Sequence, residues 1–334
     1  MVASPIGDST NTGTVMSVRI AVTNSSGVAT GEPTYARADQ VVTLYAVIEL
    51  ADHTIYSDAP KLRLADHKAL TQPLPLSKAP ALALTWQRVE PVDKTYSNTD
   101  GGQFHFTPIS YQATEIADAA DQPSIKADVR PTLTPDHGNG VGTMRYQLVV
   151  TQGDRTIASP GASARRGRGS GGLSDAVTRV TIRRDDSYLG YLTEMFGQPY
   201  IWASAGLSDR SHQSERLEGS DCADFVVYGA RRMGKPIGYT WTGGLPRIAK
   251  LISAGARDDH GIYRDARGKA LPFTKPGDLI LFPRHVGALV EDRGTIGVLD
   301  EQDIMMHTLF DSPKEQPIAD SGYADKPVEL RRFR

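Results

Sequence analysis

One amphipathic stretch around the only cysteine of the chain constrains the fold most. The run GSDCADFVVY holds Cys222, the single cysteine among 334 residues. From Cys222 onward, apolar or small residues recur at the spacing of one helix face, at Phe225, Val226, Gly229, Ala230 and Met233. Ser220 or Asp221 is suited to cap the start of this helix. Gly234 and Pro236 are suited to end it. The stretch therefore predicts a helix that begins at Cys222.

A cysteine in the first turn of a helix is well placed for chemistry. The N–H groups there have no intrahelical partner and carry the positive end of the helix dipole, so they favour a thiolate over a thiol. The alternative is that Cys222 is a small buried residue on the apolar face of its own helix. No intrachain disulfide explains a lone cysteine. We expect a nucleophile at this position.

The first half of the chain is rich in β-prone segments. Runs of β-branched, aromatic or alternating apolar residues occupy 18–22, 41–50, 54–56, 81–89, 103–113, 143–151 and 155–157. Turn-forming clusters at 24–27, 98–102 and 136–140 separate some of them. This pattern predicts an antiparallel sandwich or barrel. The histidines of this half lack metal-ligand spacing and are interpreted as exposed or packed side chains: His53, His67, His105 and His137.

A glycine-, serine- and arginine-rich stretch divides the chain. Residues 160–174 read PGASARRGRGSGGLS, whose composition is typical of a solvated linker. Three arginines without interleaved aromatics make a weak nucleic-acid site. We expect a disordered terminus, a mostly β N-terminal domain, a linker and a second domain, at 1–16, 17–160, 161–176 and 177–334. The strand-like run 177–182 fits either side of the linker.

The second half combines short helices with antiparallel strands that carry histidines. Helical patterns cover 185–196 and 247–254. The apolar run 279–282 predicts a buried strand, and the turn Pro283-Arg284 leads from it into a second strand that opens on His285. Residues 291–294 predict a hairpin turn, and His307 lies within a third run, 304–310.

Thiol catalysis needs a thiolate, a base beside it and a group that orients the base. Cys222 supplies the first, and His285 and His307 supply the other two. Taken alone, each histidine has a non-catalytic interpretation: His285 would be a side chain at the end of a strand, and His307 would be packed in the core. Together, the three residues come in the order and on the elements that this chemistry requires. Asp300 and Asp303 are alternatives to His307 as the orienting group.

The second half resembles the NlpC-type cysteine peptidases, which are papain-like enzymes that cut the peptide stems of bacterial cell wall. The resemblance rests on GQPYIW at 197–202, SDCA at 220–223, KPGDLILF with HVG at 275–287, and MMH at 305–307. It covers about residues 185–312. It implies an α+β fold in which the cysteine helix packs on an antiparallel sheet.

The resemblance also implies roles for individual residues. Cys222 would be the nucleophile, His285 the general base and His307 the residue that orients it. Tyr200 would lie near the thiol and hold the substrate or the oxyanion, and Asp221 would recognise a polar end of the substrate. Further candidates for substrate binding are Ser220, which precedes Asp221, and two aromatic residues, Trp202 and Trp241.

The implied activity is hydrolysis of an amide in peptidoglycan stem peptides, beside γ-D-glutamyl and diaminopimelate residues. It requires no metal and no organic cofactor. Two alternatives stay open. A thiol acyltransferase or transglutaminase-like enzyme would use the same three residues, and a catalytically silent protein would only bind the cell wall.

Composition narrows the partners and the compartment. A net charge of −2 gives no reason to expect nucleic acid. The sequence contains no run of 18 apolar residues, which is about the length that a membrane-spanning helix needs. The first residues lack the apolar core of a signal peptide. Because peptidoglycan lies outside the cytoplasm, we expect a secreted or periplasmic protein without its signal; a cytoplasmic protein is the alternative.

Overall fold

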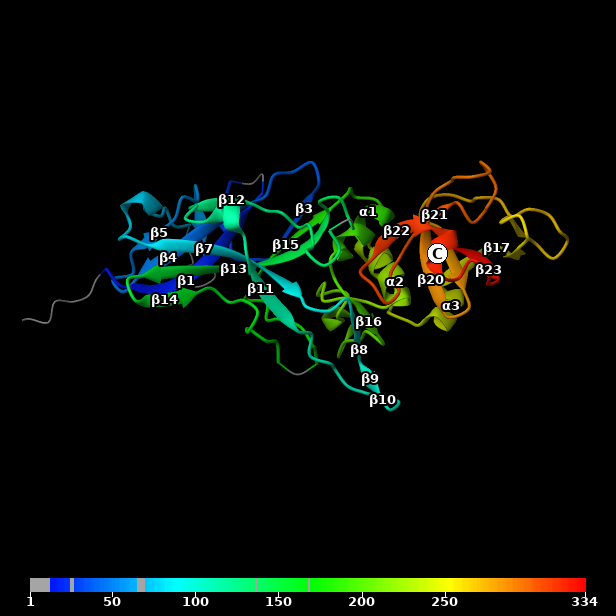
Figure 1. Ribbon diagram of the computed structural model, residues 1–334, viewed down its shortest axis with the longest axis horizontal. Helices are drawn as coiled ribbons and strands as arrows, with labels where there is room; N and C mark the ends of the chain where they lie inside the picture. Colours follow the sequence, from blue (N-terminus) through cyan, green and yellow to red (C-terminus); the bar gives the residue numbers. More distant parts are fainter. Residues whose placement is uncertain (1–12, 25–26, 65–69, 136, 168) are drawn as a thin grey trace, which may run out of the picture.

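The computed structural model is mostly β with a few short helices, which is α+β in the broad sense that the sequence predicted (Figure 1). It describes residues 13–24, 27–64, 70–135, 137–167 and 169–334. His67, residues 1–12 of the predicted disordered terminus and residues 25–26 and 136 of two predicted turns lie outside the described residues.

The first half forms two sheets that share one core. The first sheet contains β1 (Val15–Thr23), β2 (Ala29–Thr30), β4 (Thr43–Leu50), β5 (Ile55–Tyr56), β6 (Leu62–Arg63) and β12 (Ser124–Lys126). The second contains β3 (Thr34–Arg37), β7 (Ala83–Pro91), β11 (Tyr111–Glu115), β13 (Gly142–Gln152), β14 (Arg155–Ala158) and β15 (Thr178–Arg183). Alternation places Val18, Ile20 and Val22 of β1 in the buried cluster with Trp86 and Tyr146 of the facing sheet.

The predicted strand 103–113 is wrong in its middle. Residues Gln103–Phe104 form β10, which pairs only with β9 (Thr99–Asp100), and β11 starts at Tyr111. The segment between them leaves the sheet because Thr107 N–H donates to the side-chain oxygen of Asn98, at 3.1 Å, and Ile109 N–H donates to the carbonyl oxygen of Gly171. Backbone groups that bond elsewhere are lost to a strand ladder.

The predicted linker is held against both halves of the chain. Leu173 and Val177 are buried beside Ile109. Arg166 pairs with Glu218, a buried carboxylate of the second half, at 3.3 Å. β15 follows and pairs with β13 and β3, so this strand belongs to a sheet of the first half. The division into separate domains stays a prediction.

The second half is built on one sheet with the order β18-β17-β23-β19-β20-β21-β22. Its strands are β17 (Ala249–Arg257), β18 (Tyr263–Arg264), β19 (Leu279–Phe282), β20 (His285–Glu291), β21 (Ile304–His307), β22 (Lys314–Pro317) and β23 (Val328–Phe333). The turn Pro283-Arg284 joins β19 to β20 as predicted, with Arg284 in the left-handed region at φ 68°. The predicted hairpin turn at 291–294 is instead the start of a longer connection to β21.

Three short α-helices accompany this sheet: α1 (Tyr188–Leu192), α2 (Cys222–Arg232) and α3 (Leu245–Ile248). α2 begins at Cys222 as predicted, with Asp221 as its N-cap, and Gly234 just after its end has φ 82°. The predicted helix 247–254 is wrong beyond Ile248. Residues Ala249–Arg257 form β17 because they pair with β23 along most of its length.

One buried cluster joins the two halves. It runs from β1 through Val141 and Phe196 to Phe225 on α2 and Val286 on β20. In addition, β8 (Thr95–Ser97) leaves the first half and pairs in parallel with β16 (Tyr200–Trp202), the short strand before α2. Figure 1 shows β8 and β16 side by side, with β9 and β10 beyond them. Among the described residues, no helix is long and apolar enough to cross a membrane.

Candidate functional site

The thiol of Cys222 lies at the start of α2 against the sheet. The carboxylate of Asp221 accepts hydrogen bonds from the backbone N–H groups of Ala223 and Asp224, at 3.0 and 2.9 Å. The Cys222 side chain is buried, with 6 % of its surface exposed. It faces the N–H of Val286, which belongs to the peptide that joins His285 to Val286. The first peptide of β20 is therefore a direct neighbour of the sulfur.

Burial raises the pKa of the Cys222 thiol, and the negative charge of Asp221 raises it further. Hydrogen bonds from the N–H groups of Val286 and Ala223 lower it by less. The helix start was expected to favour a thiolate. A helix dipole contributes about 0.3–1 kcal/mol, whereas taking a charge out of water costs several kcal/mol. The resting side chain is therefore a neutral thiol.

We expect Asp221→Asn to lower the pKa of Cys222. Asparagine keeps an oxygen that caps α2 but removes the charge that opposes the thiolate. The pKa of Asp221 is itself raised to about 6 by burial, so the carboxylate is charged at pH 7.5 and higher, where alkylation is measured. The rate of alkylation by iodoacetamide should rise at lower pH than in the parent protein. Asp259→Asn, in an exposed loop, is the control; an unchanged pH profile for Asp221→Asn contradicts an electrostatic effect of Asp221 on the thiol.

His285 and His307 form a buried pair of imidazoles. Nε2 of His285 lies 2.8 Å from Nδ1 of His307, and the two rings meet nearly edge to face. His285 also stacks on Phe282, at a centroid distance of 6.2 Å, and lies 4.7 Å from the ring of Tyr323. These contacts fix the His285 ring, and they leave its Nδ1 without a hydrogen-bond partner in the described part of the chain.

Both imidazoles are neutral at pH 7. Burial lowers the pKa of His285 well below its usual value, and His307 lowers it further. Burial also lowers the pKa of His307 to about 3, with Lys314 adding to the effect. A neutral His285 that donates from Nε2 to His307 presents an accepting Nδ1 lone pair. No hydrogen bond joins this atom to the thiol within the described residues.

Asp300 and Asp303 organise the connection between β20 and β21. Asp303 accepts the backbone N–H groups of Arg293 and Asp300, at 2.7 and 2.9 Å. Asp300 accepts those of Thr295 and Gln302, at 2.7 and 2.9 Å. Of the candidates for the orienting group, His307 alone contacts His285 in the described residues.

The predicted substrate-binding residues fall into two groups. Tyr200 and Ser220 lie beside Cys222 and Asp221, since β16 bridges to Ser220. Tyr200 is buried, its ring packs 5.1 Å from that of Phe310, and burial, together with Cys222, raises its pKa. Trp202 is at the other end of β16 and is 41 % exposed. Trp241 lies farther along the chain and lines a cavity that does not include Cys222.

A buried polar network behind α2 was not foreseen from the sequence. The Ser204 hydroxyl donates to the carboxyl group of Asp224, at 2.6 Å, and accepts the N–H of Asp221, at 3.0 Å. Nε2 of His212 lies 3.4 Å from the same carboxyl group, and its ring stacks on Tyr239. This network holds the peptide before the nucleophile candidate. No signal in the sequence pointed to it, because the spacing of apolar residues after Cys222 places Asp224 on the opposite face of the predicted helix, and only the structure shows that this carboxyl group is buried.

The first half also contributes to the surroundings of the thiol. The side-chain amide of Asn98 donates to the carbonyl oxygen of Ala203 and to the side chain of Gln213, at 3.0 and 2.7 Å. The Thr95 hydroxyl donates to the carbonyl oxygen of Phe310, at 2.9 Å. β8 therefore braces both β16 and the segment that follows His307.

The arrangement offers a buried thiol at a helix start, an ordered imidazole pair and a neighbouring phenol. Within the described residues, no group of three or more histidine, cysteine or acidic side chains is placed to hold a metal ion. Comparisons of the chain with protein-family models, with curated proteins and with solved structures found no match.

Proposed function

We propose that this protein is a cysteine-nucleophile amide hydrolase whose second half has a papain-like fold. The observation that carries the proposal is the 2.8 Å contact between His285 and His307 beside the Cys222 helix start. Burial lowers the pKa of both imidazoles, and strongly shifted pKa values of this kind cluster at functional sites, which supports a chemical role for the pair.

In the proposed reaction, His285 acts as the general base. Its Nδ1 takes the proton of the Cys222 thiol as the sulfur attacks the amide carbonyl carbon. His307 accepts from Nε2 of His285 and holds the ring in the tautomer that this step needs. The imidazolium then gives its proton to the leaving nitrogen as the carbon–nitrogen bond breaks. Water hydrolyses the thioester and restores the thiol. The resting gap between sulfur and base closes with substrate bound, as is common for catalytic hydrogen bonds.

Two donors are suited to stabilise the oxyanion. The backbone N–H of Cys222 is in the first turn of α2, where no intrahelical acceptor exists. The Tyr200 hydroxyl is near the thiol, and its raised pKa keeps it protonated as a donor. Donors fixed before reaction stabilise the developing charge at little cost in reorganisation.

Peptidoglycan stem peptides are the proposed substrate, cleaved near γ-D-glutamyl and diaminopimelate residues. This part of the proposal rests on the resemblance of four segments to NlpC-type peptidases. Asp221, beside the thiol, would pair with an amino group of the substrate. The proposed location is outside the cytoplasm, where this polymer is found.

The direct test is digestion of purified muropeptides followed by mass measurement of the products. Hydrolysis adds water across one amide, whereas an acyltransferase would give a new amide when an amine acceptor is supplied. We expect only hydrolysis products from the parent protein, and almost none from Cys222→Ser. Products that need the amine would favour the acyltransferase. If no muropeptide is cleaved and alkylating agents do not modify Cys222, the protein would instead be a catalytically silent wall-binding protein.

Substitution of His307 tests the orienting role. We expect His307→Ala to lower kcat by roughly tenfold to thousandfold, because loss of the orienting partner is usually less harmful than loss of the nucleophile. His307→Asn should retain more activity than His307→Gln, because the amide of asparagine reaches the place of Nδ1, the atom that contacts His285. Asp300→Ala and Asp303→Ala should have mild effects. An aspartate variant as inactive as Cys222→Ala, with His307→Ala active, would give the role to that aspartate.

A further inference from the structure

A large apolar cavity opens on the second half of the protein, next to the site but outside it. Its volume is about 740 Å³, within the range of small-molecule sites. The loop with Trp241, the start of α3 at Pro246, and Ala254 and Ala256 of β17 form much of its wall. Trp241 is 72 % exposed and both alanines are exposed, so the cavity presents its apolar surface to solvent.

The cavity ends at the candidate site. Leu281 lines it and is the cross-strand partner of Val286, whose N–H faces the Cys222 thiol. Phe282 lines it as well and stacks on the ring of His285. A ligand in the cavity would therefore lie beside the imidazole pair, with the end of β19 between them.

Among the charged residues that line the cavity, all but one have a polar partner in the described part of the chain. Arg264 pairs with Asp258, at 2.5 Å, and Glu329 pairs with Arg331, at 2.6 Å. Asp265 accepts the backbone N–H groups of Arg267 and Lys269, at 2.8 and 3.0 Å.

Arg284 is the exception. Its guanidinium has no hydrogen bond or ion pair among the described residues, and the side chain is exposed. Its backbone, at φ 68°, turns sharply between β19 and β20, so the residue is fixed at the rim by the hairpin. An unpaired guanidinium at the edge of an apolar surface is complementary to a carboxylate on an apolar body.

We propose that this cavity binds a monocarboxylate with an aliphatic or aromatic body. The body lies against Trp241, Ala256 and Leu281, and the carboxylate pairs with Arg284. The proposal goes beyond the proposed function and does not depend on it, because no step of thiol chemistry enters it.

The test is calorimetric titration of the full chain with decanoate, below the concentration at which decanoate forms micelles. We expect saturable binding to one site, and binding at least tenfold weaker for decylammonium and for acetate. Decylammonium lacks the negative charge, and acetate lacks the apolar body. Equal affinity for decanoate and decylammonium would overturn the role of Arg284, and non-saturable uptake would overturn the site.

Matched variants separate the two parts of the site. Arg284→Gln should weaken decanoate binding about tenfold, the size of a lost charge-assisted contact, and Arg284→Lys should restore part of it. Arg267→Gln, in an exposed loop nearby, should bind as the parent does. Ala256→Leu places a larger side chain in the wall of the cavity where the body of the ligand lies and should weaken binding at least tenfold, whereas Ala113→Leu, at an exposed position of β11, should not. Unchanged binding by Ala256→Leu, with unfolding curves matching the parent, would refute the proposal.

Cys222→Ala distinguishes this proposal from the proposed function. The variant should bind decanoate with the affinity of the parent while it hydrolyses nothing. Loss of both properties would show that the cavity and the thiol form a single site and are not independent.

Discussion

Cys222→Ala should abolish amide hydrolysis, lowering kcat by roughly 10⁴-fold or more, as expected for loss of a covalent nucleophile. The remaining groups, Tyr200 and the imidazole pair, would bind the substrate but have no atom with which to form the thioester. Cys222→Ser should be almost as inactive, because its hydroxyl is far less acidic than a thiol and His285 is a neutral base of low pKa. The measurement is single-turnover cleavage of a muropeptide followed by mass spectrometry.

Stability is the control for this result. Cys222 is a small member of a large buried cluster, so replacing sulfur by hydrogen should cost only about 1 kcal/mol of the free energy of unfolding. An alanine variant that keeps more than about a tenth of the parent activity, a barrier change of roughly 1.4 kcal/mol, would exclude nucleophilic catalysis by this thiol.

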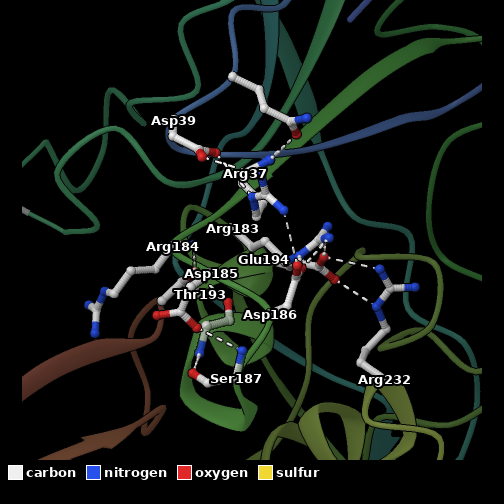
Figure 2. A network of polar contacts seen from close by, with 12 residues as sticks. Arg37, Asp39, Arg183, Arg184, Asp185, Asp186, Ser187, Thr193, Glu194 and Arg232 are labelled. Atoms are coloured by element: carbon white, nitrogen blue, oxygen red, sulfur yellow. Dashed lines mark hydrogen bonds and ion pairs between the residues drawn. The ribbon is translucent and has the colours of Figure 1, made fainter. Parts of the chain in front are cut away.

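Glu194→Ala should destabilise the fold far more than loss of a carboxylate at the surface. Glu194 is fully buried, and its carboxylate lies 3.4 Å from Arg183 of β15 and 2.9 Å from Arg232 of α2. The hydroxyl of Tyr228, also on α2, donates to it at 2.5 Å. Figure 2 shows Glu194 between the two arginines, with Asp186 linking Arg183 to Arg37. One carboxylate therefore joins a sheet of the first half to the helix that carries Cys222.

Removal of one partner from such a buried cluster leaves uncompensated charge, which typically costs about 3–5 kcal/mol. We expect a loss of that size in the free energy of unfolding, measured by denaturant titration. Glu315→Ala is the matched control, since its pair with Arg184, at 2.7 Å, is partly exposed and should contribute about 0–1 kcal/mol. Equal losses for the two variants would show that burial of Glu194 adds nothing to its interactions.

Local signals were sufficient for several elements of the second half. The spacing of apolar residues after Cys222 and a capping side chain at Asp221 predicted α2 correctly, because both act within one or two helical turns. The apolar run of β19 and the Pro283-Arg284 turn predicted a hairpin for the same reason. The order of Cys222, His285 and His307 along these elements yielded the candidate site, whose chemistry stays a prediction.

Long-range pairing overrode local preference elsewhere. The sequence of β17 favours a helix in isolation, yet its backbone groups bond to β23, which lies more than seventy residues later in the chain. Ser204, His212 and Asp224 meet only after β16 and α2 have packed, so no spacing pattern announces their network. The same holds for Glu194, whose partners come from β15 and α2.

The sequence by itself determined the helix that begins at Cys222, its cap, and the strand that opens on His285. These features depend on neighbours a few residues apart. The tertiary structure decided that His307, rather than Asp300 or Asp303, contacts His285, and that the thiol is neutral at rest. Both outcomes depend on which groups share a water-free space, and burial is a property of the whole fold.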